Sequence, residues 1–455
     1  MKKISCILSA ACLLAACSPH NPVLTVEGGQ IRGVPTDSSG VMVYKGIPYA
    51  APPVGDLRWK APAPVVPWQG VKVADTFSSI APQPGNPPGT FYGEEFYWDE
   101  HTVQSEDCLY LNVWAPAKTV GKTGAKLPVA MWIHGGAFTN GYGHEVTMDG
   151  DAWAARGVIL VTVNYRLGVL GFLSHPELTA EQGRPSGNYG LMDQIAALKW
   201  VRNNIAQFGG DPSRITIFGQ SAGAMSVKNL LISPESRDLV AGAIIQSGGG
   251  LNLGFLSPLN SIPQDFYDAQ GRDIMEAGGL GDLAAMRAAG YAQLQAAQAA
   301  YSQQGRWVML SPRVDGHVLT EDFDHSVYDG SIADVPVMIG YNLNDMGMLA
   351  GEAVDRFCAV RDSLCDKPVF EYEFMRDLPG DFLKDGEGNL PGAFHSAELW
   401  YMFHTLKNSR RPFTPADYAL SDEMMDAWTS FCKTGNPGWQ EYKKDSPYKK
   451  EFDVK

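Results

Sequence analysis

Charge is scarce in this sequence, and one sign predominates. Asp, Glu, Lys and Arg make up 19% of the 455 residues, the formal net charge is −14, and no basic block exceeds a few residues. Because phosphate backbones are bound by clustered Lys and Arg, this argues against a nucleic-acid partner. Internal repeats and long Gly/Ser-rich or Pro-rich linkers are also absent, whereas 45% of the residues are hydrophobic. The sequence therefore predicts a large globular core rather than disorder or several small domains.

Cysteine and histidine are too scattered for a metal centre. No group of them has the spacing of a metal site, so we expect no metal and no other cofactor. Three of the seven cysteines lie within the first 17 residues, and Cys108 lies in an apolar run that predicts a buried thiol. Cys358 and Cys365 could close a short disulfide loop in an oxidising compartment.

The N-terminus has the pattern of a targeting segment rather than of a membrane-spanning helix. Lys2 and Lys3 precede an apolar run that, at about 13 residues, is too short to span a bilayer. The run ends in Leu14-Ala15-Ala16-Cys17, which resembles the lipobox of bacterial lipoproteins. We expect a signal peptide over 1–16, lipidation of Cys17, a tether over 17–21 and a single domain over 22–455. The chain would then be exported to the cell envelope and held at a bacterial membrane by its lipid anchor. The alternative is an ordinary cleaved signal with an incidental cysteine.

Short apolar runs bounded by turn residues predict buried strands of a mostly parallel sheet. They lie at 129–133, 158–163, 215–218, 242–245 and 335–339. Apolar residues recur every three or four positions over 191–208, which predicts a helix that Gly209 and Gly210 stop and after which Asp211-Pro212 turns the chain. We also expect a helix over 280–301 and a loop over 378–394. Strand, helix and strand in this order favour an α/β fold with right-handed crossovers.

Ser221 is the candidate nucleophile. The β-branched and aromatic run 215–218 leads into Gly219-Gln220-Ser221-Ala222-Gly223, and a helical pattern follows over 224–231. A serine on a sharp strand-to-helix turn exposes its hydroxyl, and the flanking glycines avoid clashes with the neighbouring backbone. The amides at the start of the helix favour a developing oxyanion.

A glycine-rich turn is the candidate second oxyanion element. The strand at 129–133 ends in His134-Gly135-Gly136-Ala137-Phe138. Backbone amides fixed in such a turn stabilise the negative charge of a tetrahedral intermediate, each contributing about 2.7–4 kcal/mol. His134 lies at the strand end, where a structural histidine is expected rather than a base.

A serine nucleophile needs a base and an orienting carboxylate, which in such folds follow in the order Ser, acid, His. Asp345 comes after the strand at 335–339 and is the candidate acid; Asp334 and Asp315 are alternatives. Of the later histidines, His395 follows a loop, whereas His404 lies in a helical pattern. A base that must reach the site suits a loop, which favours His395.

Several segments together resemble the type-B carboxylesterase family, which includes the cholinesterases. One is Glu106-Asp107-Cys108-Leu109-Tyr110-Leu111-Asn112-Val113-Trp114; others lie at 44–55, 164–168, 187–194 and 434–437. The resemblance covers nearly the whole chain beyond the targeting segment. It implies an α/β-hydrolase fold, with a mostly parallel central sheet flanked by helices. It also implies a serine carboxylesterase with the triad Ser221, Asp345 and His395, and it places the oxyanion amides on Gly136, Ala137 and Ala222.

The sequence also departs from the family pattern. Gln220 stands where the family usually has Glu, Asp345 is one methylene shorter than the usual acid, and Cys108 lacks its upstream disulfide partner. Only 50 positions separate Asp345 from His395, which predicts a reduced helical cap and an open cleft. The aromatic residues of 91–98 could line a substrate pocket or form a buried core.

These features predict hydrolysis of carboxylic esters through an acyl-enzyme on Ser221, in a cleft that accepts bulky or aromatic esters. Two alternatives remain open. One is a catalytically silent binding module of cholinesterase type, and the other is a lipase or polyesterase that acts at an interface. The sequence does not predict an oligomeric state.

Overall fold

The computed structural model describes residues 21–98, 102–252, 262–345, 350–381, 390 and 392–455. The expected signal peptide over 1–16 and Cys17 lie outside the described residues, as does most of the tether over 17–21. Within the described chain, no helix has the length and apolar character needed to cross a membrane.

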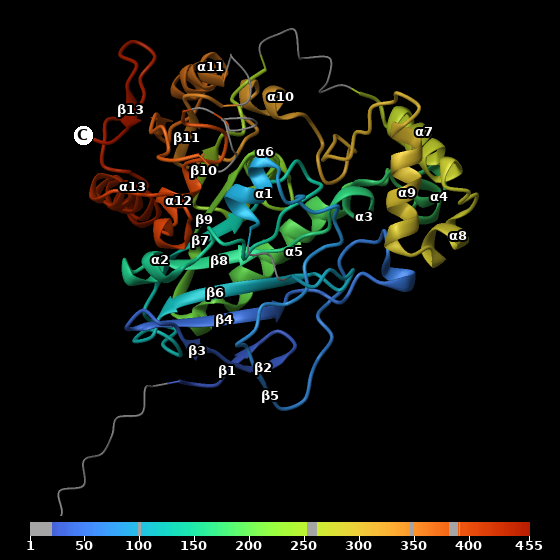
Figure 1. Ribbon diagram of the computed structural model, residues 1–455, viewed down its shortest axis with the longest axis horizontal. Helices are drawn as coiled ribbons and strands as arrows, with labels where there is room; N and C mark the ends of the chain where they lie inside the picture. The colour runs from blue at the N-terminus through green and yellow to red at the C-terminus, as the bar shows by residue number, and fades with distance from the viewer. Residues whose placement is uncertain (1–20, 99–101, 253–261, 346–349, 382–389, 391) are drawn as a thin grey trace, which may run out of the picture.

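A ten-stranded sheet forms the centre of the described chain (Figure 1). Its order is β13 (Lys449–Phe452), β12 (Val369–Phe374), β11 (Val337–Asn342), β10 (Gly242–Gln246), β9 (Gly210–Gln220), β7 (Leu127–Ile133), β8 (Ile159–Val163), β6 (Tyr110–Pro116), β4 (Val41–Pro48) and β3 (Val34–Pro35). Neighbours from β8 to β13 are parallel, whereas β6, β4 and β3 join antiparallel. A small second sheet contains β1 (Leu24–Val26), β2 (Gly29–Arg32) and β5 (Val71–Val73).

Helices cover both faces of the large sheet. One face packs on α5 (Tyr189–Asn204) and α6 (Ala222–Ile232), and the other on α2 (Asp151–Ala155), α12 (Leu399–Met402) and α13 (Pro415–Thr434). Adjacent residues of β7 show the division: Met131 belongs to the core that includes α6, and Trp132 to the core that includes α13. Because both faces are buried, β8, β10 and β11 appear in the sequence as continuous apolar runs.

The remaining helices surround this frame. They are α1 (Phe91–Phe96), α3 (Gly168–Phe172), α4 (Pro176–Gln182), α7 (Gln264–Ala277), α8 (Leu283–Ala288), α9 (Tyr291–Ser302), α10 (Phe323–Tyr328) and α11 (Ala350–Leu364), with 3-10 turns at Gly55–Leu57, Ile205–Phe208, Arg237–Leu239 and Leu406–Asn408. Helices α4, α7, α8 and α9 form a lobe at one side of the sheet (Figure 1).

Three sequence-based expectations were wrong in detail. The helix expected over 280–301 is two helices, because α8 ends before Ala289 and α9 begins after Gly290. Asp211-Pro212 does not turn the chain but lies within β9, whose first residue pairs with Leu127 across a register shift. Cys358 and Cys365 are free thiols, since the two turns of α11 between them separate their backbones by about 10 Å, too far for a disulfide.

Candidate active site

Ser221 occupies a strained turn between β9 and α6. Its backbone has φ 57° and ψ −125°, an uncommon conformation for a residue with a side chain, and its amide donates to Gln246 O at 2.9 Å. The turn depends on glycine at both flanks. A Cβ on Gly223 would lie 2.0 Å from Ile133 O, and one on Gly219 would lie 2.5 Å from the carbonyl carbon of Gly223.

The turn that follows β7 lies directly against this serine. A Cβ on Gly135 would lie 3.1 Å from Ser221 Cβ, so glycine allows the close approach. Gly136 and Ala137 both have positive φ, 98° and 53°, and within the described chain neither amide donates a hydrogen bond. Ala222 is the first residue of α6, where backbone amides have no intrahelical acceptor. All three amides are thus available to an oxygen bound beside Ser221.

The structure brings His395 and Asp345 together from two loops. His395 Nδ1 is hydrogen-bonded to Asp345 Oδ1. The two loops are joined by a bridge in which Asn344 N donates to Ala393 O and Ala393 N donates to Asn344 Oδ1, each at 3.0 Å. The hydrogen bond at Nδ1 leaves Nε2 of a neutral imidazole free to accept a proton.

Nε2 of His395 faces Gln220 rather than Ser221. Gln220 Nε2 lies 3.2 Å from His395 Nε2, and within the described chain the Ser221 hydroxyl makes no hydrogen bond to the imidazole. Gln220 is buried and lies next to Ser221 in the chain. Because this position is Gln220 and not Glu, a neutral amide lies against the imidazole where a carboxylate would otherwise lie.

The electrostatic surroundings raise the pKa of His395. Burial alone would lower this pKa, but the hydrogen bond and charge of Asp345, together with the charge of Glu398, outweigh it. The imidazolium form is therefore stabilised beside a carboxylate, as a base that must hold a proton transiently requires.

Glu398 is a site residue that the sequence reasoning missed. It is fully buried, and Asn342 Nδ2 donates to its Oε2 at 2.6 Å and to Phe394 O at 2.7 Å. Burial raises the pKa of Glu398 to about 7, the Asn342 hydrogen bond lowers it, and the charge of Asp345 raises it further. The sequence feature that could have indicated this role is the position of Glu398, three residues after His395 and directly before the apolar helix α12.

The rejected candidates have structural partners elsewhere. The ring of His134 is buried, its Nδ1 lies 2.9 Å from Gly135 O, and it stacks on Tyr165. His404 Nδ1 lies 2.8 Å from Ser421 Oγ on α13. Asp315 Oδ1 accepts hydrogen bonds from three backbone amides of its own turn, and Asp334 Oδ1 accepts a hydrogen bond from Lys367 N.

The aromatic residues of 91–98 divide between the two expected roles. Phe91 and Phe96 are buried against Phe394 and belong to the core. Tyr92 lies beside the site, since its hydroxyl donates to His395 O at 3.2 Å. These contacts hold the loop that carries the imidazole.

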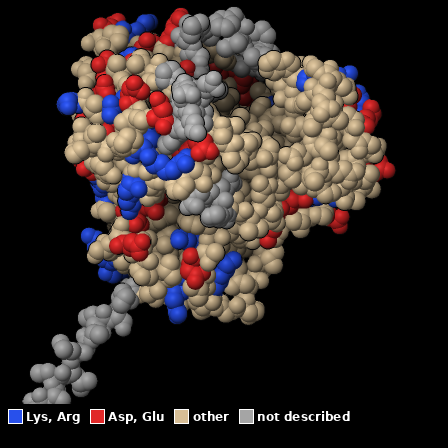
Figure 2. Space-filling view, in the orientation of Figure 1, with Lys and Arg blue, Asp and Glu red and all other residues tan. Residues whose placement is uncertain are grey.

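A cavity of about 520 Å³ opens beside the site, between the segment 247–252 that follows β10, α6 and the segment 309–324. Phe138, next to the oxyanion turn, and Asp345 are among its lining residues. Figure 2 shows the surface hollowed between the main body and the lobe that carries α7 and α9. In the part of the chain that the structure describes, no three His, Cys, Asp or Glu side chains are grouped to hold a metal ion.

The comparisons with known proteins agree with this arrangement. The carboxylesterase family model matches residues 20–364 and 357–453. A para-nitrobenzyl esterase of Bacillus subtilis (strain 168) is 34% identical over 483 residues, 91% of this chain and 90% of that protein. A fumonisin B1 esterase of Sphingopyxis macrogoltabida is 39% identical over 385 residues, 82% of this chain but only 64% of that relative's length.

Solved structures show the same relationship. A thermophilic PNB esterase superposes with a TM-score of 0.81 at 30% identity, and the Geobacillus stearothermophilus carboxylesterase EST55 with a TM-score of 0.77 at 30% identity. Both matches cover 95% of this chain and 96% of the other. The chain therefore has the predicted α/β-hydrolase fold, belongs to the carboxylesterase family and is a serine hydrolase of small-molecule carboxylic esters.

Proposed function

We propose that this carboxylesterase forms its acyl-enzyme on Ser221, with His395 as the base and Asp345 as the acid that orients it. The observation that carries the proposal is the strained turn at Ser221, with the paired imidazole and carboxylate beside it. Nε2 accepts the hydroxyl proton as Ser221 Oγ attacks the ester carbonyl carbon, and then donates it to the leaving alcohol. Water, activated by the same imidazole, releases the acid. Such catalytic hydrogen bonds often tighten only once substrate is bound, so Nε2 would turn from Gln220 to Ser221 at that stage.

The amides of Gly136, Ala137 and Ala222 are the proposed oxyanion hole. The first two belong to the turn that packs against Ser221 through Gly135, and they donate to no other group of the described chain. Negative charge grows on the carbonyl oxygen during attack, and donors already in place stabilise it without reorganisation. The N-terminal end of α6 adds a favourable field at the same position.

Bulky or aromatic esters are the proposed substrates. The cavity volume of about 520 Å³ falls in the range of small-molecule sites, and Met225 in its wall is 48% exposed. The para-nitrobenzyl esterase relative is named for an aromatic ester. The short chain between Asp345 and His395 further supports a reduced cap.

The leader sequence supports a location at the cell envelope of a bacterium. Lys2, Lys3 and the lipobox-like segment before Cys17 indicate export and lipidation of that cysteine. Several acyl chains on one residue would be sufficient for stable anchoring.

Hydrolysis of 4-nitrophenyl acetate, butyrate and benzoate by the purified chain tests the proposed reaction. We expect turnover of all three, loss of turnover by Ser221→Ala and His395→Ala, and full activity of the matched control Ser363→Ala on exposed α11. Activity retained by Ser221→Ala would overturn the assignment of the nucleophile. Confinement to the acetyl ester would overturn the proposed open cleft.

A further inference from the structure

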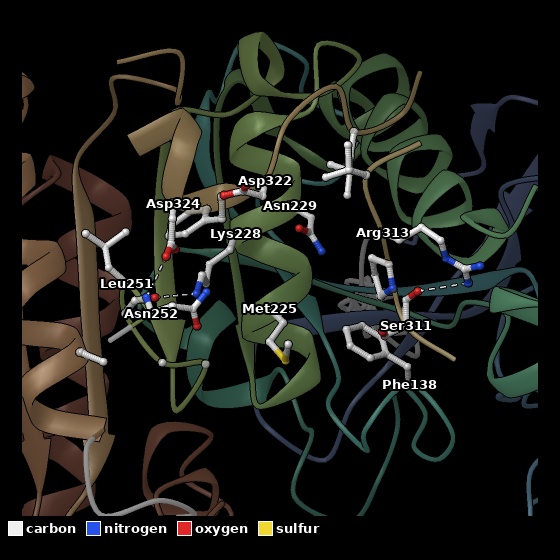
Figure 3. Close-up of a pocket in the computed structure, with 18 of the residues that line it drawn as sticks. Phe138, Met225, Lys228, Asn229, Leu251, Asn252, Ser311, Arg313, Asp322 and Asp324 are labelled. Atoms are coloured by element: carbon white, nitrogen blue, oxygen red, sulfur yellow. Dashed lines mark hydrogen bonds between the residues drawn. The ribbon is translucent and has the colours of Figure 1, made fainter. Parts of the chain in front are cut away.

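The cavity beside the site extends along the helix that begins at the nucleophile (Figure 3). Met225, Lys228 and Asn229 line it from α6, and they follow Ser221 by four, seven and eight residues. These spacings place all three on the helix face that Ser221 begins. Lys228 therefore lies about 10 Å along the helix from the nucleophile. Apolar side chains, among them Phe138, line the intervening space.

Lys228 presents a cation to this cavity without a carboxylate partner. Its Nζ donates to Gly250 O at 2.8 Å and lies 4.4 Å from the centre of the Phe323 ring. Within the described residues no carboxylate oxygen lies within 4 Å of this ammonium, and 253–261 and 346–349, beside the cavity in sequence, contain no Asp or Glu. Burial lowers the pKa of Lys228 to about 8, and the charge of Asp324 raises it.

The other charged groups at the cavity have structural tasks. Asp324 Oδ2 accepts a hydrogen bond from Asn252 N, and Asp322 Oδ1 accepts one from His325 N, each at 2.9 Å. Glu321 is exposed, and Asp345 is bound to the triad imidazole. The Arg313 guanidinium points away from α6 and donates to Ser311 O (Figure 3). It also donates to Phe172 O and packs on the Tyr267 ring, and its Nε and Nη1 are buried without a partner in the described chain. Lys228 is thus the cation available to a ligand in the cavity.

The position of the base decides which part of an ester occupies this cavity. His395 must donate a proton to the leaving alcohol, so the alcohol lies beside the imidazole and the acyl chain points away from it. Phe138, next to the oxyanion turn, and Met225, one turn along α6 from Ser221, line the cavity; of the imidazole and its carboxylate partner, Asp345 lines it and His395 does not. The acyl chain is therefore the part that would extend along α6 towards Lys228.

We propose that Lys228 selects esters whose acyl chain ends in a carboxylate, that is, monoesters of dicarboxylic acids. The apolar middle of the acyl chain contacts Phe138 and Met225, and its terminal carboxylate accepts a hydrogen bond from Lys228 Nζ. A charge-assisted hydrogen bond in a partly desolvated site is stronger than a neutral one. This inference rests on the proposed function, because it assumes acyl transfer to Ser221.

The test compares acidic and neutral esters of matched length on the full chain. The substrates are 4-methylumbelliferyl monoesters of adipic and suberic acid, with the hexanoyl and octanoyl esters as neutral counterparts. In Lys228→Met, a variant of similar shape, we expect the acidic-to-neutral ratio of kcat/KM to fall about 10- to 100-fold. The control Lys199→Met, at an exposed position of α5, should keep the wild-type ratio. In Asp324→Asn the ratio, measured at pH 6 where Lys228 stays protonated, should rise, because a negative charge near the bound carboxylate is removed.

An unchanged ratio in Lys228→Met or a fall in Asp324→Asn would overturn the inference. If Lys228→Met does not fold, Lys228→Gln and Asp324→Asn provide the same test with opposite expected directions. Failure of the proposed function has a different signature, namely no turnover of any ester, the neutral pair included, by the wild-type chain.

Discussion

At the scale of single residues, the site depends on how His395 is held. Asp345 binds Nδ1, Gln220 faces Nε2, and Tyr92 donates to the backbone carbonyl. The hydrogen bond from Asp345 fixes the tautomer before substrate arrives, whereas Nε2 still has to turn from Gln220 to Ser221. The candidate acid Asp345 was chosen from the sequence because it follows a strand of the parallel sheet, and the structure pairs it with His395. The contact with Gln220 could not be, because it depends on how two distant loops pack.

Asp345→Asn tests the orienting carboxylate. A catalytic base acts in its neutral form, and the pKa of His395 is raised, so activity should fall as pH drops through a value above 6.5. The amide removes the charge and favours the wrong tautomer, so we expect kcat to fall about 10⁴-fold and the acidic limb to move to lower pH. The pH profile of kcat/KM measures both effects. Asp334→Asn is the control, and an equal loss in that variant would contradict the assignment.

Glu398→Gln tests the buried carboxyl group behind the triad. The pKa of Glu398 is about 7 in the folded chain and about 4.5 when the group is unperturbed, so the folded state binds the proton more tightly. Its stabilising contribution is full below about pH 4.5 and is lost as pH rises through about 7. Urea unfolding at pH 5 and pH 8 should show Glu398→Gln gaining up to about 3 kcal/mol relative to wild type over that interval. If the free energies of unfolding of wild type and Glu398→Gln changed equally between pH 5 and pH 8, the raised pKa of Glu398 would be refuted.

At the scale of elements, two connections build the site. The β9–α6 turn presents Ser221, the proposed nucleophile, and the turn after β7 approaches it closely enough that glycine is required. Both could be predicted, because their turn chemistry is local. The division of 280–301 into two helices and the continuation of β9 through Pro212 could not, because tertiary pairing overrides local signals there. The disulfide prediction failed because it ignored helical geometry between Cys358 and Cys365.

Gly223→Ala tests the close packing between the β9–α6 turn and the end of β7. The added methyl group would lie 2.0 Å from Ile133 O, so the backbone must shift. We expect a loss of about 1–3 kcal/mol or more in the free energy of unfolding, and reduced activity, since the same shift displaces Ser221. Thermal unfolding and ester turnover measure the two effects. Gly124→Ala, which meets no atom within 4 Å, is the control, and equal stability of both variants would contradict the packing argument.

At the scale of the whole molecule, the described chain is a sheet enclosed by helices, with a lobe of helices beside the site (Figure 1). Five strands of the central sheet, β7 to β11, were predictable because each contains an apolar run. The fully buried β12 was not, because its run includes Glu371 and Glu373. The placement of the α7–α9 lobe was not, because amphipathic helices do not encode which surface they cover. The proposed anchor would hold this molecule at a membrane through Cys17, outside the described residues.

Cys17→Ser tests the anchor in cells of a bacterium that processes lipoproteins. We expect the wild-type chain to take up labelled palmitate and to sediment with membranes, and the variant to do neither. Cys12→Ser, inside the expected signal peptide, should behave as wild type. A wild-type chain without label would show that the cysteine is incidental to an ordinary signal.

The central claim, that Ser221 carries the acyl group, is tested most directly by peptide mass spectrometry after reaction with a fluorophosphonate. Ser247 and Ser396 also have positive φ and serve as internal comparisons. We predict one modification per chain, on the peptide that contains Ser221, and none in Ser221→Ala. Modification of a different serine, or equal modification of Ser221→Ala, would contradict the account.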